Sequence, residues 1–127
     1  MAYPSGSGTE LAKRTTIHAQ SNTATAFRWD GTMATTGTST YTVTANHIIT
    51  VLGISFCDQG DAAEAIDMYM NDGGNDITLL QSQPLPAFGT FVWNDRFILT
   101  GGDKLIINAG SSANIDVICN YVDTDWR

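Results

Sequence analysis

The chain has 127 residues, which is the size of a single domain, and 43% of them are hydrophobic, as in a globular protein. Only 15% are charged, so the polar surface is largely uncharged. Its net charge of −7 argues against nucleic acid as a partner, because binding a phosphate backbone needs clustered Lys and Arg. No apolar run approaches the roughly 20 residues that span a bilayer, and the first residues lack the pattern of a secretory signal. We therefore expect no membrane partner and synthesis in a reducing cytoplasm.

Residues 1–14 show neither the period of a strand nor that of a helix, and they include the flexible stretch SGSG. A segment of this composition cannot build a core of its own, so we expect an extended N-terminal arm that clamps a neighbouring subunit. The arm residues expected at the interface are Tyr3, Leu11, Lys13 and Arg14. Residues 15–127 are predicted to form one domain.

From residue 15 onward, short β-forming runs alternate with turn residues. In chain order the runs are TTIHAQ, TATAFRW, STYTVT, HIITVLGISFC, EAIDMYMN, ITLLQSQ, GTFVWN, RFILT, DKLIIN and NIDVICNYV. Gly, Asn, Asp and Pro separate them, and only the short segment DAAEA has any helical character. Many short strands at roughly 8–12-residue spacing predict an all-β fold, namely a single antiparallel β-sandwich that is jelly-roll-like.

The run HIITVLGISFC, residues 47–57, is apolar on both faces. Its even positions are the predicted core face: Ile48, Leu52, Ile54 and Phe56. Ile49 and Val51 would then point to the other face, and a strand that is apolar on both faces is usually covered on both. We expect a neighbouring subunit to cover Ile49 and Val51.

The segments after residue 70 predict a hairpin turn, an end to strand pairing and the side chains of the last strand that point into the core. DGGND at residues 72–76 predicts a hairpin turn because consecutive glycines permit positive φ, and PLP at residues 84–86 is expected to end regular pairing. The side chains of the last strand that are predicted to point inward are Ile115, Val117, Cys119 and Tyr121, and Asp116 and Asn120 are predicted to point outward. Cys57 and Cys119 are expected to be reduced core residues, with a disulfide between neighbouring strands as the alternative.

No residue is assigned a catalytic role. His18 and His47 have no second ligand nearby in the sequence, and HxH, HExxH, CxxC and GxSxG are absent. The chain is therefore expected not to be an enzyme and to need no cofactor. Asp72, Asn75 and Asp76 offer oxygen ligands for calcium. Hairpin turns use the same residue types for their conformation alone, so we expect no metal site there.

The tryptophans are the candidates for carbohydrate binding. Trp29, Trp93 and Trp126 belong to a residue type that forms sugar platforms, but their spacing shows no platform. Trp126 stands beside Arg127 in the tail DTDWR, and both residue types are enriched at interface centres. We expect Trp126 to anchor a subunit interface, with a docked C-terminal strand as the alternative.

Three segments carry a resemblance to a known group of proteins. TYTVTANHIITVLGISFCDQ, residues 40–59, has a TVxAN turn before an apolar strand, and FILTGGDKLIINAG, residues 97–110, has a Gly-Asp step before a strand. Gly102 is expected to permit a turn at this step, and Asp103 to accept backbone N–H bonds across it. SSANIDVICNYVDTD, residues 111–125, is similar to a terminal A-N-x-V-D-V strand, although Asn120 stands where the usual pattern has Ser. Together these segments resemble small β-sandwich structural proteins of tailed-bacteriophage virions.

The resemblance implies a non-enzymatic virion structural protein that forms symmetric oligomers, either a capsid decoration (cement) protein or a tail or fibre component. We expect a capsid decoration protein that oligomerises as a homotrimer, because a short single-domain chain with an arm and no fibrous repeat suits a protein that repeats over a shell. Its partners would be copies of itself and the major capsid protein or other virion proteins. It would be made in the host cytoplasm and be located in the virion. The alternative is a tail or fibre component, or a receptor-binding module that recognises carbohydrate.

Overall fold

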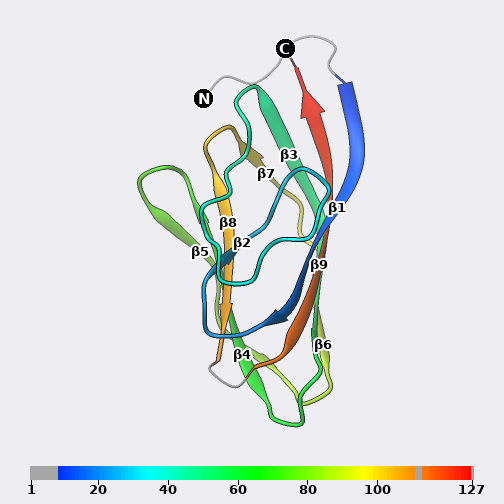
Figure 1. Ribbon diagram of the computed structural model, residues 1–127, viewed down its shortest axis with the longest axis vertical. Coiled ribbons are helices and arrows are strands. Elements are labelled where there is room, and N and C mark those ends of the chain that lie inside the picture. The colour runs from blue at the N-terminus through cyan, green and yellow to red at the C-terminus, as the bar shows by residue number, and fades with distance from the viewer. Residues whose placement is uncertain (1–8, 111–112, 127) are drawn as a thin grey trace.

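Nine β-strands are present in the computed structural model, which describes residues 9–110 and 113–126 (Figure 1). They are β1 (Thr9–Gln20), β2 (Thr25–Ala26), β3 (His47–Asp58), β4 (Glu64–Asn71), β5 (Asp76–Leu85), β6 (Thr90–Trp93), β7 (Phe97–Thr100), β8 (Lys104–Ala109) and β9 (Ile115–Asp125). The described residues contain no helix, and hence none that could cross a bilayer. The all-β prediction is confirmed.

The strands form two antiparallel sheets that face each other (Figure 1). Sheet A has the order β1-β9-β3-β6, with β7 also paired to β3, and sheet B has the order β2-β8-β4-β5. The long strand β3 pairs along one side with β9, and along its other side first with β7 and then with β6. The predicted antiparallel sandwich is therefore confirmed.

The core lies between the sheets and is built from alternate residues of each strand, as the two-residue period of a strand requires. The inward row of β9 is buried as predicted: Ile115, Val117, Cys119 and Tyr121. The Tyr121 ring packs edge-on against Trp29 with centroids 4.9 Å apart, and its hydroxyl accepts a hydrogen bond from the Gly31 N–H at 3.0 Å. These contacts join the connection that follows β2 to the centre of sheet A.

A β-bulge in β3 reverses the predicted orientation of the first half of this strand. The register of β3 against β9 shifts between Val51, which lies opposite Tyr121, and Gly53, which lies opposite Asn120. Leu52 is therefore the bulged residue, with no residue of β9 opposite it. Ile49 and Val51 point into the core and are 0% exposed within the single chain, whereas Leu52 is 37% exposed. The expectation that a neighbouring subunit covers Ile49 and Val51 is wrong, because their own chain covers them.

The domain begins earlier in the chain than predicted. β1 starts at Thr9 and pairs regularly with β9, from Thr9 opposite Asp125 to Ile17 opposite Val117. Residues 9–14 are therefore part of sheet A, and the predicted boundary after residue 14 is wrong. The remainder of the expected arm, including Tyr3, lies outside the described residues.

The connection between β2 and β3 takes the place of a predicted strand. The segment STYTVT does not form a strand, and β2 has only two residues. Instead the Ala34 N–H donates to the Thr16 carbonyl of β1 at 2.8 Å, and the Val43 N–H donates to the Asp103 carbonyl beside β8 at 2.9 Å. The connection thus bridges the two sheets along one side of the sandwich (Figure 1).

Two of the predicted turns are formed. Gly73 has a φ of +97° in the hairpin between β4 and β5, and Gly102 has a φ of +92° where the chain passes from β7 in sheet A to β8 in sheet B. The Asp103 carboxylate supports the second turn by accepting a hydrogen bond from the Thr100 N–H at 2.8 Å. The expected break at PLP is wrong for its first two residues, because Pro84 and Leu85 lie within the edge strand β5, where a missing N–H is tolerated.

Candidate assembly surface

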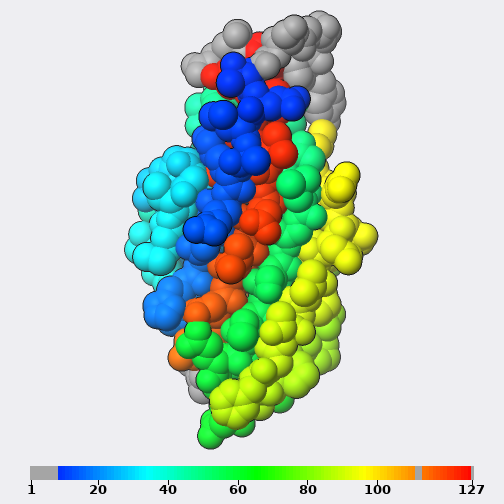
Figure 2. Space-filling model, turned by 90° about the vertical axis from the view of Figure 1, so that its right-hand side faces the viewer, coloured from blue at the N-terminus to red at the C-terminus, as the bar shows by residue number. Residues whose placement is uncertain are grey.

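The outer face of sheet A carries exposed apolar side chains; Figure 2 views this side of the molecule. The large ones are Leu52 of β3, Val92 of β6, Ile98 of β7 and Ile118 of β9, and we call these four residues the A face. Val92 and Ile118 lie on either side of Ser55 in neighbouring strands, and Ile98 lies opposite Thr50. The A face therefore extends across four strands of one sheet.

Uncharged polar residues separate the members of the A face. Thr16 of β1 lies opposite Ile118, and Asn120 follows two positions along β9. The exposed fractions of the A-face side chains range from 37% for Leu52 to 56% for Val92, so each has surface left to bury. Apolar area with few charges is the composition of interface cores.

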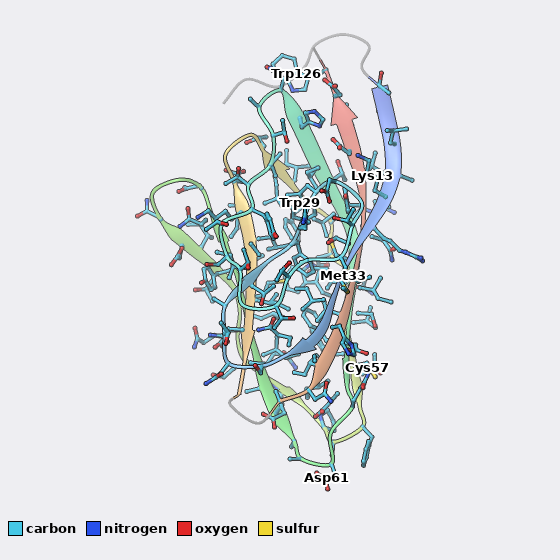
Figure 3. The ribbon with its side chains drawn as sticks, in the orientation of Figure 1. Lys13, Trp29, Met33, Cys57, Asp61 and Trp126 are labelled. Carbon is cyan, nitrogen blue, oxygen red and sulfur yellow. The ribbon has the colours of Figure 1, made fainter. Side chains whose placement is uncertain are left out.

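A shallow hollow of about 380 Å³ adjoins the A face. Met33, from the connection after β2, forms one wall beside β1 and β9 (Figure 3) and is 60% exposed. Ile118 and Thr16 also line the hollow, so its surface is continuous with the A face. The hollow extends the apolar surface toward the β1 side of the sheet.

Both histidines are held by carboxylates at the two ends of β9. His18 Nδ1 lies 2.9 Å from Asp116 Oδ1, and His47 Nδ1 lies 2.7 Å from Asp123 Oδ1. Asp123 is buried, and its other oxygen accepts a hydrogen bond from Lys13 Nζ at 3.1 Å. Lys13, which we expected at an interface, thus already has an ionic partner inside its own chain.

The other expected interface residues lie at the surface. Leu11 is 53% exposed and Arg14 is exposed, both on β1. Trp126 lies half-buried at one end of the molecule (Figure 3), where its backbone N–H donates to the Asn46 carbonyl at 3.2 Å. This hydrogen bond docks the C-terminal tail onto the fold, and an interface role for Trp126 stays a prediction.

The calcium candidates lie in the exposed hairpin between β4 and β5. Asp72 Oδ1 accepts hydrogen bonds from the N–H groups of Asn75 at 2.9 Å and Gly74 at 3.1 Å. These hydrogen bonds hold the pKa of Asp72 below its ordinary value, and the bond from Asn75 has the larger effect. Asp76 Oδ1 accepts a hydrogen bond from the Asn71 side chain. Within the described residues, no three His, Cys, Asp or Glu side chains are grouped in a way that could hold a metal ion.

Chelation is expected to leave the protein unchanged. The Asp72 carboxylate stabilises its turn through backbone N–H groups, so removing divalent cations should alter neither the melting temperature nor self-association. Thermal unfolding and light scattering, each with and without EDTA, check this prediction. Dissociation on chelation that calcium alone reverses, and magnesium does not, would show that the turn is a calcium site.

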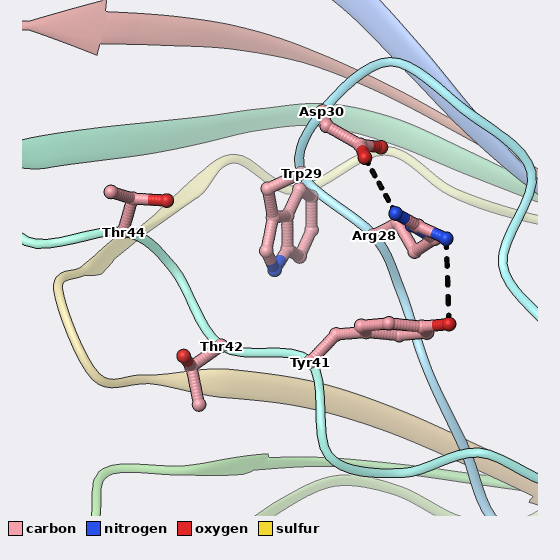
Figure 4. Close-up of a pocket in the computed structure, with 6 residues that line it drawn as sticks. All are labelled: Arg28, Trp29, Asp30, Tyr41, Thr42 and Thr44. Atoms are coloured by element: carbon pink, nitrogen blue, oxygen red, sulfur yellow. Dashed lines mark hydrogen bonds and ion pairs between the residues drawn. The ribbon is translucent and has the colours of Figure 1, made fainter.

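A small polar pocket of about 150 Å³ lies between the two ends of the β2–β3 connection (Figure 4). Its lining residues are Arg28, Trp29, Asp30, Tyr41, Thr42 and Thr44. Arg28 donates to Asp30 Oδ2 at 2.8 Å and lies over the Tyr41 ring, 4.6 Å from its centroid. Hydrogen bonds lower the pKa of Asp30, and the bond from Thr32 has a larger effect than the bond from Arg28. The buried Trp29 Nε1 has no hydrogen-bond partner among the described residues.

The two cysteines differ in environment, and neither forms a disulfide among the described residues. Cys119 is buried in the core as predicted, and burial raises the pKa of its thiol to about 12. Cys57 is only half-buried, because it alternates with the inward Phe56 and Asp58 and therefore points to the outer face of sheet A. The expectation of a core position is thus confirmed for Cys119 and wrong for Cys57.

Sequence reasoning missed the A face and Met33. One signal was available: Asp116 and Asn120 were predicted to point outward, and Ile118 lies midway between them on the same face. Leu52 was missed because it was assigned to the core face of β3, and its exposure depends on the bulge.

Comparison with known proteins identifies a fold rather than a family. No family model and no curated protein matches the chain. The chain is similar to a chain of the Bacillus endospore appendages, described as a novel family of disulfide-linked pili, with a TM-score of 0.54 and 14% identity over 100% of this chain and 97% of that one. At this identity the likeness shows a shared fold alone, and the class that it defines is the all-β sandwich.

Two further solved structures give lower scores. A chain of infectious bursal disease virus, Gx strain, has a TM-score of 0.44 and 11% identity over 90% of this chain and 37% of that one. Eiger TNF from S. frugiperda has a TM-score of 0.38 and 15% identity over 98% of this chain and 89% of that one.

Proposed function

We propose that this chain is a non-enzymatic structural subunit of a bacteriophage virion, and specifically a capsid decoration protein. It binds copies of itself and the major capsid protein or another virion protein, and its expected oligomeric state is a homotrimer. The observation that carries the proposal is the A face, an exposed apolar patch across four strands of one sheet.

The A face supplies free energy for association. Burial of apolar surface contributes roughly 25 cal/mol per Å² before the costs of ordering and of lost rotational freedom. Large exposed apolar patches on soluble proteins mark interaction sites. The A face places four exposed apolar side chains on one sheet among uncharged polar residues, and this supports a contact with another protein. The all-β sandwich, a fold shared with a pilus chain, agrees with a structural role.

Lysine substitution of the A face tests this proposal. Ile118→Lys and Val92→Lys place a charge in the expected contact, and we predict that binding to shells of the virus that encodes the chain weakens at least tenfold. Ile77→Lys is the matched control, since Ile77 is 45% exposed on β5 of sheet B and outside the A face. Co-sedimentation with isolated shells measures the effect. Undiminished binding of both A-face variants, with all variants folded, would contradict the proposal.

The pocket beside Trp29 favours a second function, carbohydrate recognition by a tail or receptor-binding protein. Its hydroxyl, guanidinium and carboxylate groups match the hydrogen-bonding needs of a sugar, and the unpartnered Trp29 Nε1 could donate to one. The Trp29 ring is only 8% exposed, so it offers no stacking platform, and we rank this function second. Saturable quenching of tryptophan fluorescence by a glycan, together with no binding to shells, would favour it.

A further inference from the structure

β1 offers a long, regular strand edge. The other edge strands of the described residues are short or interrupted: β2, β6 and β7 have two or four residues each, and β5 contains Pro84 and a positive φ at Ser82. Natural sheets use such features to prevent edge-to-edge pairing. β1 has 12 residues and pairs with β9 without a register shift over residues 9–17.

The backbone groups on this edge can be assigned from one hydrogen bond. The Thr16 carbonyl accepts from the Ala34 N–H, which lies on the side of β1 away from β9. Residues of an antiparallel strand direct their backbone groups to alternate sides, so Glu10, Ala12 and Arg14 point theirs the same way as Thr16. No strand within the described part of the chain pairs with these three residues on that side.

We propose that β1 pairs antiparallel with β1 of a second copy of this chain, with Ala12 on the two-fold axis. In this register Glu10 of each copy lies opposite Arg14 of the other, which gives two opposite-charge pairs related by the axis. Both side chains are exposed in the single chain. The two A sheets would join into one continuous sheet, and the pairing would end at Thr16, whose carbonyl is already taken by Ala34.

The same register places Leu11 opposite Lys13 of the other copy. Leu11 is 53% exposed in the single chain, and the aliphatic stem of a lysine can cover it while its ammonium remains bound to Asp123. This contact rests on the self-assembly in the proposed function and specifies where two copies meet. It joins copies in pairs around a two-fold axis, so it would link one trimer to another rather than hold three copies together, and it leaves the A face for the shell.

Charge reversal tests the contact. Glu10→Arg and Arg14→Glu each turn both ion pairs into like-charge pairs, so each variant alone should self-associate roughly tenfold more weakly than the wild type. An equimolar mixture of the two variants should associate about as well as the wild type, because the arginines of one face the glutamates of the other. Sedimentation velocity on the full chain across a concentration series measures all three.

Two controls complete the test. Arg96→Glu makes the same charge change at an exposed site between β6 and β7, and it should associate like the wild type. Ala12→Pro removes an N–H that the β9 ladder does not use, so it should leave the fold intact by circular dichroism and weaken the pairing. The contact is overturned if the mixture fails to associate or if the single variants associate like the wild type. Neither result contradicts the proposed function, provided that the chain still binds isolated shells through its A face.

Discussion

Replacing Val51 with aspartate is expected to unfold the chain, whereas the same replacement at Leu52 should leave it folded. Val51 is fully buried between the sheets, and a carboxylate there would lose its hydration without gaining a partner. The loss should exceed about 4 kcal/mol, a large part of the stability of a small domain. The bulge turns Leu52 outward, so its replacement should cost no more than about 1 kcal/mol.

Urea unfolding followed by circular dichroism measures both variants, with Ile49→Asp as a second core position. Ile49 is also fully buried, so it should behave like Val51. If Val51→Asp and Ile49→Asp fold normally and lose only their ability to associate, the two residues face a neighbouring subunit after all. That result would contradict the bulge in β3.

The free energy of unfolding should fall steeply at alkaline pH. Burial raises the pKa of the Cys119 thiol from 9.0 to about 12 and that of the Tyr121 hydroxyl from 10.0 to about 12. Well below pH 9 both groups are protonated in the folded and unfolded chains, so their full contribution is present. As the pH rises toward 12, the unfolded chain loses these protons first, and stability is lost. One pKa unit corresponds to about 1.4 kcal/mol, so the loss should be several kcal/mol.

A pair of cysteine variants isolates the contribution of the buried thiol. Cys119→Ala removes the titrating group from the core and should flatten the decline between pH 9 and 12, while Cys57→Ala, at the half-buried thiol, should decline like the wild type. Urea unfolding at a series of pH values gives the slopes. Equal slopes for the wild type and Cys119→Ala would show that the thiol does not retain its proton in the folded state.

Where local signals were sufficient, the sequence predicted the structure. The apolar residues at every second position of β9 identified its inward row from Ile115 to Tyr121, and the glycines of the β4–β5 hairpin identified its turn. The Gly-Asp step was expected to let Asp103 accept a backbone N–H across the turn, and Thr100 supplies that N–H. Each of these features depends on residues close together in the chain.

The errors arose where one residue changes the register or where partners are distant in the chain. In a strand with a period of two, a single extra residue moves every side chain before it to the opposite face. Gly53 was the available signal for the bulge, because an isolated glycine within a strand often marks one. Residues 9–14 lack a clear period, and they form a strand because β9, more than 100 positions later, supplies the partner.

Electron cryomicroscopy of phage virions purified from the cells that produce this chain tests the proposed function most directly. We predict copies of the β-sandwich repeated over the outside of the capsid shell, with Val92 and Ile118 of the A face buried against neighbouring proteins. Copies confined to the tail, or virions that contain no copy of the chain, would contradict a capsid decoration protein.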